Sequence, residues 1–371
     1  MTVGSIGTFS GPLASSDAGF EDTLKAWVAY TNANGGLNGH PVKLLIKDDA
    51  GNPTTGLAAA RDLIQNEHVI AIVSDTSSVD TAWETVPAQA GVPVVGGSAI
   101  DLPFLTNSDF YASGTNTFAA VWGVEALGKQ SGPKQSVLYC VEAPACAASI
   151  PVYKAFAKPL GMSIPYTQSI SAAAADYTAV CQAIKQSGAQ SYVMVDAAAI
   201  VGRVADACLQ QGVTAKVVEA SSAVEPSLLT SKGTDGLLSA AVDFPFIDNS
   251  NAATKEFHTV LAKYGPSGLE KNFGPGLNVP WVAMQLFGAA VKAGGSGPVT
   301  SDSIKAGLYT MKGETLGGLA PPLTFVKGQA NLQNCYFVLG ISKGAFTSPD
   351  GLKTSCAPDA LVEASVKAIK S

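Results

Sequence analysis

Two short loops rich in hydroxyl and small residues are the parts of the sequence best suited to holding a small molecule. The first loop, 74–78, reads Ser-Asp-Thr-Ser-Ser and follows the apolar run 69–73. The second, 96–99, reads Gly-Gly-Ser-Ala and follows the apolar run 92–95. Hydroxyl groups and bare backbone N–H groups can hydrogen-bond a polar group. These loops therefore predict binding of a small polar group without reaction.

No local motif for catalysis or metal binding is present. The sequence has no GxSxG elbow, no HExxH, no P-loop and no GxGxxG after its first expected strand. No two cysteines have CxxC spacing, and the three histidines lie far from the cysteines in sequence: His40, His68 and His258. We therefore predict a protein that is not an enzyme and that needs no cofactor or metal.

The chain has six cysteines, an even number without metal or redox spacing. This pattern favours disulfides and an oxidising compartment. We predict the pairs Cys140–Cys146, Cys181–Cys208 and Cys335–Cys356. The alternative is six buried free thiols in a cytosolic protein.

The bulk composition fits an exported protein of two domains. The chain has 371 residues, 47% of them hydrophobic and only 14% charged. Its net charge is −6 and no stripe of Lys and Arg is visible, which excludes nucleic acid as a partner. No run of about 18 apolar residues is long enough to span a membrane. We interpret Met1 as an initiator added to a mature chain whose targeting segment was removed.

The two hydroxyl loops belong to one strand–helix–strand unit, 69–100. The expected helix covers 79–90 and ends at Gly91. Such units have parallel strands and a right-handed crossover, and ligands bind at the carboxyl ends of the strands. Strands and helices alternate in this way from the first strand to about residue 219, which predicts a doubly wound, parallel α/β architecture. From 323 onward we expect β-ribbons, followed by a last amphipathic helix over 358–369.

Several stretches match one family of proteins. They are VGSIGTFSGPLASSDAG, TNANGGLNGHPVKLLIKDDAGNPTTGLAAARDLI, the strand–helix–strand unit, and DYTAVCQAIKQSGAQ. With them the chain resembles the solute-binding proteins of ABC importers for leucine, isoleucine and valine, which have the type I periplasmic binding fold. The resemblance implies two doubly wound lobes joined by a three-crossing hinge, with the ligand in the cleft between them. Placing the crossings near 115–118, 244–247 and 323–332 gives lobe one as 1–117 plus 246–325. Lobe two is then 118–245 plus 326–371.

The resemblance also implies a set of ligand-binding residues. In lobe one, the two hydroxyl loops would grip the ligand carboxylate through Thr76, Ser77, Ser78, Ser98, Ala99 and Ile100, although the family prefers Thr where Ile100 stands. The first loop, around Phe9 and Ser16, would border the same cleft. In lobe two, the family's amino-acid binders pair the ligand ammonium with an acidic residue, but here Ser221 occupies that position and Glu219 precedes it by two. An aromatic or aliphatic acid without an ammonium group therefore competes with an amino acid as the ligand.

Other candidates follow from the order of the elements. Glu142 and Asp196 come directly after expected lobe-two strands, where they could contact ligand or cap helices. Trp281 lies on an apolar helix and could line the cleft or pack in the core. Ser77 and Ser78 could cap the following helix as well as bind ligand, because a helix start offers free N–H groups to an anion.

We therefore expect an extracytoplasmic solute-binding protein of an ABC importer. Its ligand would be a small, mostly apolar carboxylate, either a branched-chain amino acid or an aromatic or aliphatic acid. Its partner would be an ABC permease in the membrane, and the protein would act as a monomer in the periplasm or at the cell surface, with a lipid anchor as one means of attachment. The alternative is a ligand-sensing receptor ectodomain of the same fold.

Overall fold

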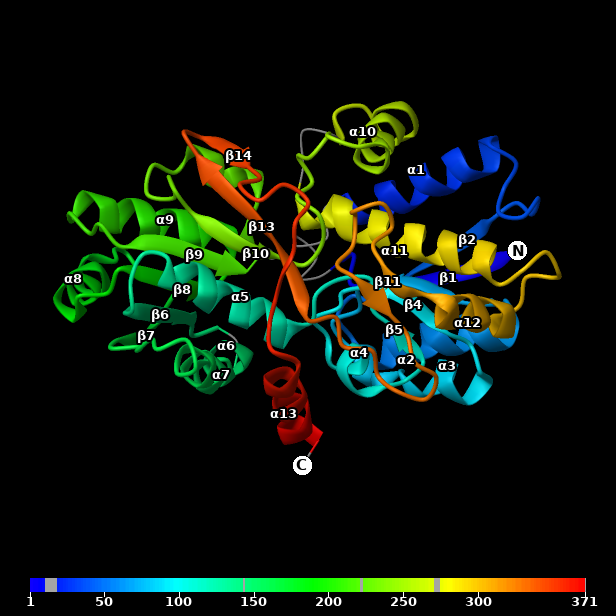
Figure 1. Cartoon of the computed structure of the whole chain (residues 1–371), viewed down its shortest axis with the longest axis horizontal. Coiled ribbons are helices and arrows are strands. Elements are labelled where there is room, and N and C mark those ends of the chain that lie inside the picture. The colour runs from blue at the N-terminus through cyan, green and yellow to red at the C-terminus, as the bar shows by residue number, and fades with distance from the viewer. Residues whose placement is uncertain (11–18, 143, 221–222, 270–273, 371) are drawn as a thin grey trace. The chain divides into compact units, whose positions relative to one another are not determined.

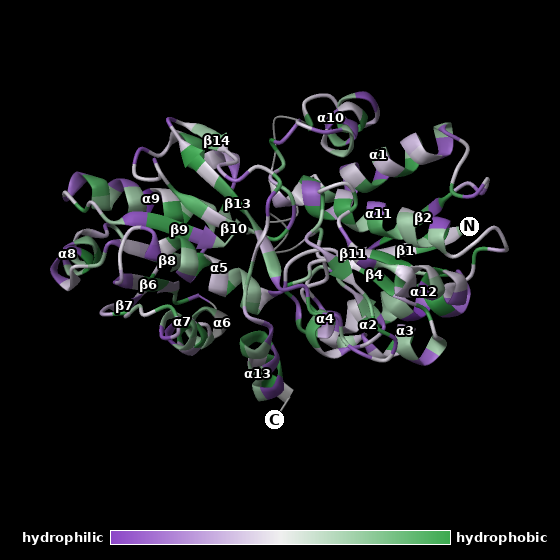
Figure 2. Cartoon of the chain, viewed as in Figure 1, coloured by the Kyte–Doolittle hydropathy of each residue, from purple (hydrophilic) through white to green (hydrophobic). Residues whose placement is uncertain are grey.

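The computed structural model describes residues 1–10, 19–142, 144–220, 223–269 and 274–370 (Figure 1). The chain forms two compact units. Unit 1 comprises Met1–Thr117, Val242–Cys335 and Pro358–Ser371, and unit 2 comprises Phe118–Ala241 and Tyr336–Ala357. Strands such as β4, β9 and β13 are largely hydrophobic, whereas the helices carry both kinds of residue (Figure 2). This distribution is the one expected of buried sheets covered by amphipathic helices.

Unit 1 is built on a parallel sheet with the strand order β2-β1-β3-β4-β5. The strands are β1 (Thr2–Gly7), β2 (Lys43–Asp48), β3 (Ile72–Asp75), β4 (Val94–Gly97) and β5 (Phe110–Tyr111). One face carries a cluster of buried residues that includes Ile6, Leu63, Ile72, Trp83 and Phe104. The strand order and direction mean that the loops after β3 and β4 lie at the same edge of the sheet.

Helices lie on both faces of the unit 1 sheet. α2 (Pro53–Arg61), α3 (Thr85–Ala90) and α4 (Leu102–Thr106) lie on the face with the Trp83 cluster. α1 (Phe20–Ala33) and α11 (Pro275–Ala293) lie on the other (Figure 1). The unit also contains α10 (Ala252–Tyr264), α12 (Ser301–Thr310), α13 (Asp359–Lys370) and a ribbon of β11 (Lys312–Glu314) and β12 (Leu323–Thr324).

Unit 2 is built on a second, mixed sheet with the order β14-β13-β10-β9-β8-β6-β7. The parallel strands are β6 (Gln135–Cys140), β7 (Thr167–Ile170), β8 (Ser191–Val195), β9 (Lys216–Ala220) and β10 (Leu238–Ala241). β13 (Cys335–Ser342) and β14 (Ala345–Thr347) continue it antiparallel, and β15 (Ser355–Cys356) pairs with β13. The helices are α5 (Thr117–Lys129), α6 (Pro144–Ala148), α7 (Ile150–Ala157), α8 (Thr178–Ser187) and α9 (Ala198–Gln210). The predicted α/β class with parallel sheets is confirmed.

The strand–helix–strand unit is present with two corrections. β3 begins at Ile72 rather than Val69, and β3 and β4 end at Asp75 and Gly97, so the first two residues of each predicted loop lie in a strand. β3 and β4 are parallel neighbours, and Gly91 ends α3 in the left-handed conformation with φ of 69°, both as predicted. The expected continuous helix over 79–90 is instead a short 3₁₀ turn, Asp80–Ala82, followed by α3. The reason is Pro87, which lacks an N–H and would clash with the carbonyl of residue 83 inside a continuous helix. Because α3 begins at Thr85, Pro87 falls in its first turn, where it is tolerated.

The last helix belongs to a different unit from the one we expected. We placed residues 326–371 in lobe two, but α13 groups with unit 1, where it packs against α4. Asn334 Nδ2 also donates a hydrogen bond to Asp359 Oδ1 at the start of α13, over 2.7 Å. By this division the chain passes between units at four points, after Thr117, Ala241, Cys335 and Ala357, rather than at three.

Candidate ligand-binding site

A cavity of about 290 Å³ lies in unit 2, at the carboxyl ends of β6, β8 and β9. Its volume is close to the lower end of the range for small-molecule sites. The lining combines a disulfide, two carboxyl groups and apolar surface: Cys140, Cys146, Tyr153, Met194, Val195, Asp196, Ala197, Glu219, Ala220 and Ala223. The carboxyl edge of a parallel sheet is where ligands bind in open α/β folds, so this cavity is the leading candidate site in unit 2.

Asp196 places an incompletely paired carboxyl group in the cavity wall. Its Oδ1 accepts a hydrogen bond from the N–H of Ala197 over 2.7 Å, at the start of α9. Its Oδ2 is buried and has no hydrogen-bond partner among the described residues. Burial raises the pKa of the Asp196 carboxyl, and the negative charge of Glu142 adds to this effect. Asp196 therefore has an acceptor oxygen for which the described residues supply no donor.

Glu219 is the second carboxyl group of the lining and is almost completely buried, with 1% of its surface exposed. Its Oε1 accepts a hydrogen bond from the N–H of Met194 over 3.0 Å, between neighbouring strands β9 and β8. Burial raises the pKa of Glu219 well above its usual value, and the charge of Asp196 raises it further. Both effects favour the protonated, neutral form of Glu219.

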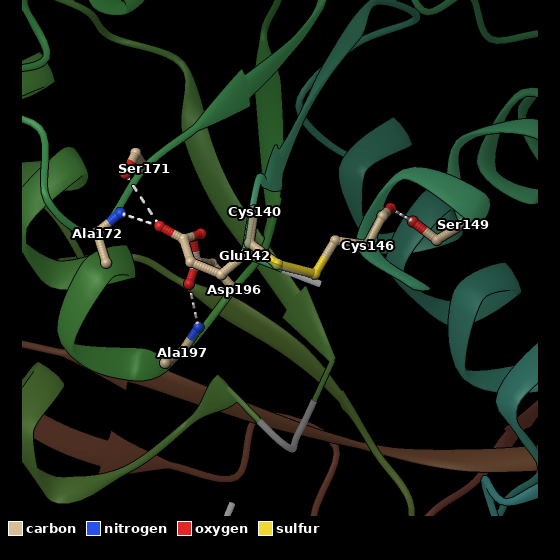
Figure 3. The surroundings of a disulfide bond; sticks show 8 residues. All are labelled: Cys140, Glu142, Cys146, Ser149, Ser171, Ala172, Asp196 and Ala197. Carbon is tan, nitrogen blue, oxygen red and sulfur yellow. Dashed lines mark hydrogen bonds between the residues drawn. A yellow bond between two sulfur atoms is a disulfide. The ribbon is translucent and has the colours of Figure 1, made fainter. Parts of the chain in front are cut away.

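Glu142 is exposed and lies beside Asp196 (Figure 3). Its Oε1 accepts hydrogen bonds from the N–H of Ala172 (2.8 Å) and the hydroxyl of Ser171 (3.0 Å). These bonds, the one from Ala172 first, lower the pKa of Glu142, so its charge persists at neutral pH. Among the described residues, every ion pair lies in unit 1. The acids at this end of unit 2 therefore have no basic partner in that part of the chain.

The disulfide predictions are confirmed for all three pairs, because Cys335 and Cys356 are the two bonded cysteines that remain. Cys140 is bonded to Cys146, and Cys181 to Cys208. Cys335 and Cys356 are also disulfide-bonded, and the described part of the chain has no free cysteine. Only Cys140–Cys146 contributes to the cavity; it joins the end of β6 to α6 (Figure 3).

In unit 1, the first hydroxyl loop follows β3. Ser77 is fully buried, and its Oγ accepts hydrogen bonds from the N–H of Val79 (3.2 Å) and from Trp83 Nε1 (3.1 Å). Ser78 is exposed and shares a 2.9 Å hydrogen bond with the hydroxyl of Thr8, while Thr76 is half-buried. The structure thus gives Ser77 a turn-stabilising role, and it leaves the side chains on either side of it accessible.

The second hydroxyl loop follows β4, next to the first at the same edge of the sheet. Ser98 is half-buried, Ala99 is buried and Ile100 is 38% exposed. The two loops approach closely: a Cβ on Gly97 would lie 2.0 Å from the backbone oxygen of Asp75, and Gly97 has φ of 131°. Only glycine fits there, because a side chain would collide and the conformation is strained for other residues. The close contact brings Ser98 N within 2.7 Å of Asp75 O.

The other described candidates are Phe9 and Trp281. Phe9 follows β1 beside the first hydroxyl loop, since a Cβ on Gly7 would meet both its ring and the Thr76 methyl group. Phe9 is half-buried, and its ring packs 5.9 Å from that of Phe20. Trp281 is fully buried in unit 1, with its ring 5.6 Å from that of Phe257. This is a core position, the second of the two alternatives given for Trp281. Ser16 and Ser221 lie outside the described residues.

The sequence analysis did not identify several residues of the cavity lining. Tyr153 and Ala223 come from α7 and from the segment after β9, and no local signal marks them. The place of the disulfide does have a local signal, because the run Ser-Val-Leu-Tyr-Cys at 136–140 is typical of a strand, and Cys140 is the last residue of β6, at the edge where ligands bind.

Among the described helices, none is long and apolar enough to cross a membrane.

Comparisons with known proteins agree with this architecture. The family model described as Periplasmic binding protein matches residues 1–345. A branched-chain amino acid ABC transporter structure from Thermus thermophilus with bound valine superposes with a TM-score of 0.82 at 15% identity, covering 98% of each chain. A leucine binding protein from Thermotoga maritima gives 0.73 at 14% identity, covering 97% of this chain and 99% of that chain.

A third similar structure has a different kind of ligand. It is an ABC transporter solute binding protein from R. palustris in complex with 4-hydroxybenzoate, with a TM-score of 0.73 at 21% identity, covering 97% of this chain and 98% of that chain. No curated protein sequence matches the chain significantly. The match to the family model extends over both units, and the neighbours share the fold. The chain therefore belongs to the periplasmic binding protein family, whose members are extracytoplasmic binding proteins rather than enzymes.

Proposed function

We propose that this protein is the solute-binding component of an ABC importer and that it binds a small, mostly apolar carboxylate. The observation that carries the proposal is the cavity at the carboxyl ends of β6, β8 and β9, in a chain of this family. Most of its lining is apolar, and a few polar groups are placed among the apolar ones, as is usual for small-molecule sites. Its size suits a ligand of amino-acid dimensions.

Unit 1 would supply the groups that bind the carboxylate. The loops after β3 and β4 lie together, and they offer the accessible hydroxyls of Ser78 and Ser98 along with backbone N–H groups. Ser77 would act mainly by holding the first loop in shape, because its oxygen already accepts two hydrogen bonds. Neutral donors of this kind bind an anion without reacting with it.

The acids of unit 2 favour an amino acid over a simple acid as the ligand. Asp196 has a buried oxygen without a partner and lies beside the charged Glu142, and neither acid has a basic partner among the described residues. A ligand ammonium group would offset this negative potential and donate to the free oxygen. A ligand that carried only a carboxylate would be repelled there. Asp196 would then pair with the ligand ammonium. In the family's amino-acid binders, an acidic residue at the position of Ser221 has this role.

A thermal-shift comparison of matched ligands tests the function. The pairs are leucine with 4-methylpentanoate and valine with 3-methylbutanoate, each differing by the ammonium group, with 4-hydroxybenzoate as an aromatic acid. A ligand at about 100 times its Kd stabilises the native state by about 2.7 kcal/mol, which raises Tm by several degrees. We expect leucine or valine to raise Tm and the deaminated partners to leave it unchanged.

Two results would contradict parts of this proposal. A shift with the acids alone would make the ligand an aliphatic or aromatic acid, in keeping with the 4-hydroxybenzoate complex of the R. palustris protein. No shift with any compound of the panel would count against binding of a small apolar carboxylate. Transport would be tested separately, by uptake of the bound compound in cells that carry or lack this protein.

The location and partner follow from the proposed role. A protein of this kind works outside the cytoplasm and delivers its ligand to a permease in the membrane, and we propose that it does so as a monomer, either free in the periplasm or held at the cell surface. Sedimentation of the protein with ligand present well above its Kd measures the mass of the bound form and so tests whether it is a monomer. A mass of about twice that of the chain would contradict it.

A further inference from the structure

The Cys140–Cys146 disulfide is part of the cavity wall as well as a cross-link. Both cysteines line the cavity together with Asp196 and Glu219. Cys140 is the last residue of β6, and Cys146 lies in α6, six residues further along the chain (Figure 3). The bond therefore closes the connection that carries Glu142 and fixes α6 against the end of the sheet.

Contacts of the described residues also hold this connection: α6 lies against α7 and β6, and the hydroxyl of Ser149 donates to Cys146 O over 2.7 Å. On the side of β6, the N–H of Val141 donates to Ile170 O over 3.0 Å, and Glu142 accepts bonds from Ser171 and Ala172. The side chain of Val141 is 54% exposed, so it adds little apolar burial. α6 has only five residues, and helices much shorter than about 12 residues are marginal without tertiary support. The disulfide is thus the covalent support of this wall.

We propose that the Cys140–Cys146 disulfide is a positioning element of the ligand cavity, and that ligand affinity depends on its remaining oxidised. This inference rests on the proposed function, because it takes the cavity to be the ligand site. Binding to a wall that is already ordered costs less conformational entropy than binding to one that must be ordered first. If the disulfide were opened, the wall would have to become ordered when ligand binds. The entropy lost in that ordering would reduce the binding free energy, and affinity would fall.

The second disulfide of unit 2 provides a matched comparison. Cys181 and Cys208 join α8 to α9, are fully buried and do not line the cavity. Cys146 is half-buried and Cys140 is 8% exposed, so a small reagent can reach this bond more readily. A dithiol such as dithiothreitol would attack one sulfur and form a mixed disulfide. This first step releases one cysteine thiol. The second thiol of the reagent would then attack the mixed disulfide, close the oxidised ring and release the other cysteine thiol.

The test reduces the full-length protein in its native state with graded dithiothreitol. Alkylation and mass spectrometry of peptides identify which cysteines have opened, and calorimetry with leucine, valine and 4-hydroxybenzoate measures affinity. We expect Cys140 and Cys146 to open first and the affinity for the compound that binds to fall at least about tenfold. Removal of the reagent and reoxidation should restore it. The paired variants Cys140→Ala/Cys146→Ala and Cys181→Ala/Cys208→Ala should separate the roles, the first losing affinity and the second keeping it.

Hydrogen exchange provides a readout that needs no ligand. Opening Cys140–Cys146 should speed exchange in α6 and at residues 141–142, while β8 and β9 stay protected, which also shows that the protein remains folded. Unchanged exchange after opening would overturn the positioning role, and faster exchange with unchanged affinity would overturn the dependence of binding on the disulfide. If none of the three compounds binds the oxidised protein, the proposed ligand class and the claim about affinity both fail, whereas the exchange result still decides the positioning role.

Discussion

Trp83 Nε1 donates a hydrogen bond to Ser77 Oγ over 3.1 Å, and both side chains are completely buried in unit 1. The N–H of Val79 donates to the same oxygen over 3.2 Å. One of the side chains expected to contact ligand is therefore engaged in ordering the segment that follows β3. This contact sets a local role for Ser77 that can be measured apart from binding.

Replacing Ser77 with Ala should destabilise the protein by about 1–3 kcal/mol, because two N–H donors lose their acceptor in a buried setting. Urea unfolding of the variant measures this cost. Ser78→Ala is the control: Ser78 is exposed, and its loss should cost less than about 1 kcal/mol. Wild-type stability in Ser77→Ala, together with a tenfold loss of ligand affinity, would show instead that Ser77 contacts the ligand.

Asp196→Asn should weaken leucine binding at pH 7 about tenfold or more. The amide keeps an oxygen that can accept from Ala197 N–H, so the change removes charge while preserving shape. Glu142→Gln removes a charge from an exposed neighbour and should change affinity less than about threefold. Isothermal titration of both variants gives the comparison. Equal affinities in wild type and Asp196→Asn would rule out the ammonium contact.

Glu125 should make stability depend on pH. It lies on α5, is fully buried, and neither carboxylate oxygen has a hydrogen-bond partner among the described residues. Burial raises the pKa of Glu125 to about 8 in the native state, above its value in the unfolded chain. The native state then holds a proton that the unfolded state releases between about pH 4.5 and pH 8, so this group's contribution to stability is complete below that window and is lost as pH rises through it.

Glu125→Gln should remove this dependence. The variant and the wild type should differ little at pH 4, where both are neutral at this position, and the variant should be more stable by about 2–4 kcal/mol at pH 8.5. Urea unfolding at a series of pH values measures the difference. Parallel stability curves for the two proteins from pH 4 to 8.5 would mean that Glu125 does not carry the titration.

The Cys181–Cys208 disulfide should contribute mainly to stability. It closes 27 residues of chain, for which the loss of unfolded-state entropy corresponds to about 3.5 kcal/mol. Cys181→Ala/Cys208→Ala should therefore lower the free energy of unfolding by about that amount, as measured in urea without reductant. A variant as stable as the wild type would show that strain or residual structure cancels the entropic effect.

Local sequence patterns predicted the features of the fold that depend on neighbouring residues. Apolar runs followed by small or hydroxyl residues indicated β3 and β4 and the loops after them. Gly91 indicated the end of α3, because glycine takes the left-handed conformation there without steric cost. The disulfides Cys140–Cys146 and Cys181–Cys208 were also predicted. The break in the 79–90 helix lies at 83–84, before α3, and its cause, Pro87, is also present in the local sequence.

The candidate site depended on contacts that no local pattern contains. Asp196, Glu219 and the Cys140–Cys146 disulfide come from different strands, and they share one cavity because β6, β8 and β9 are parallel neighbours in the sheet. The direction of the Ser77 side chain toward Trp83, and the packing of α13 on α4 in unit 1, were likewise decided by tertiary structure. Periodicity and turn residues report what a segment forms and where it ends. Which buried groups meet is set by strand order and by packing between segments far apart in the chain.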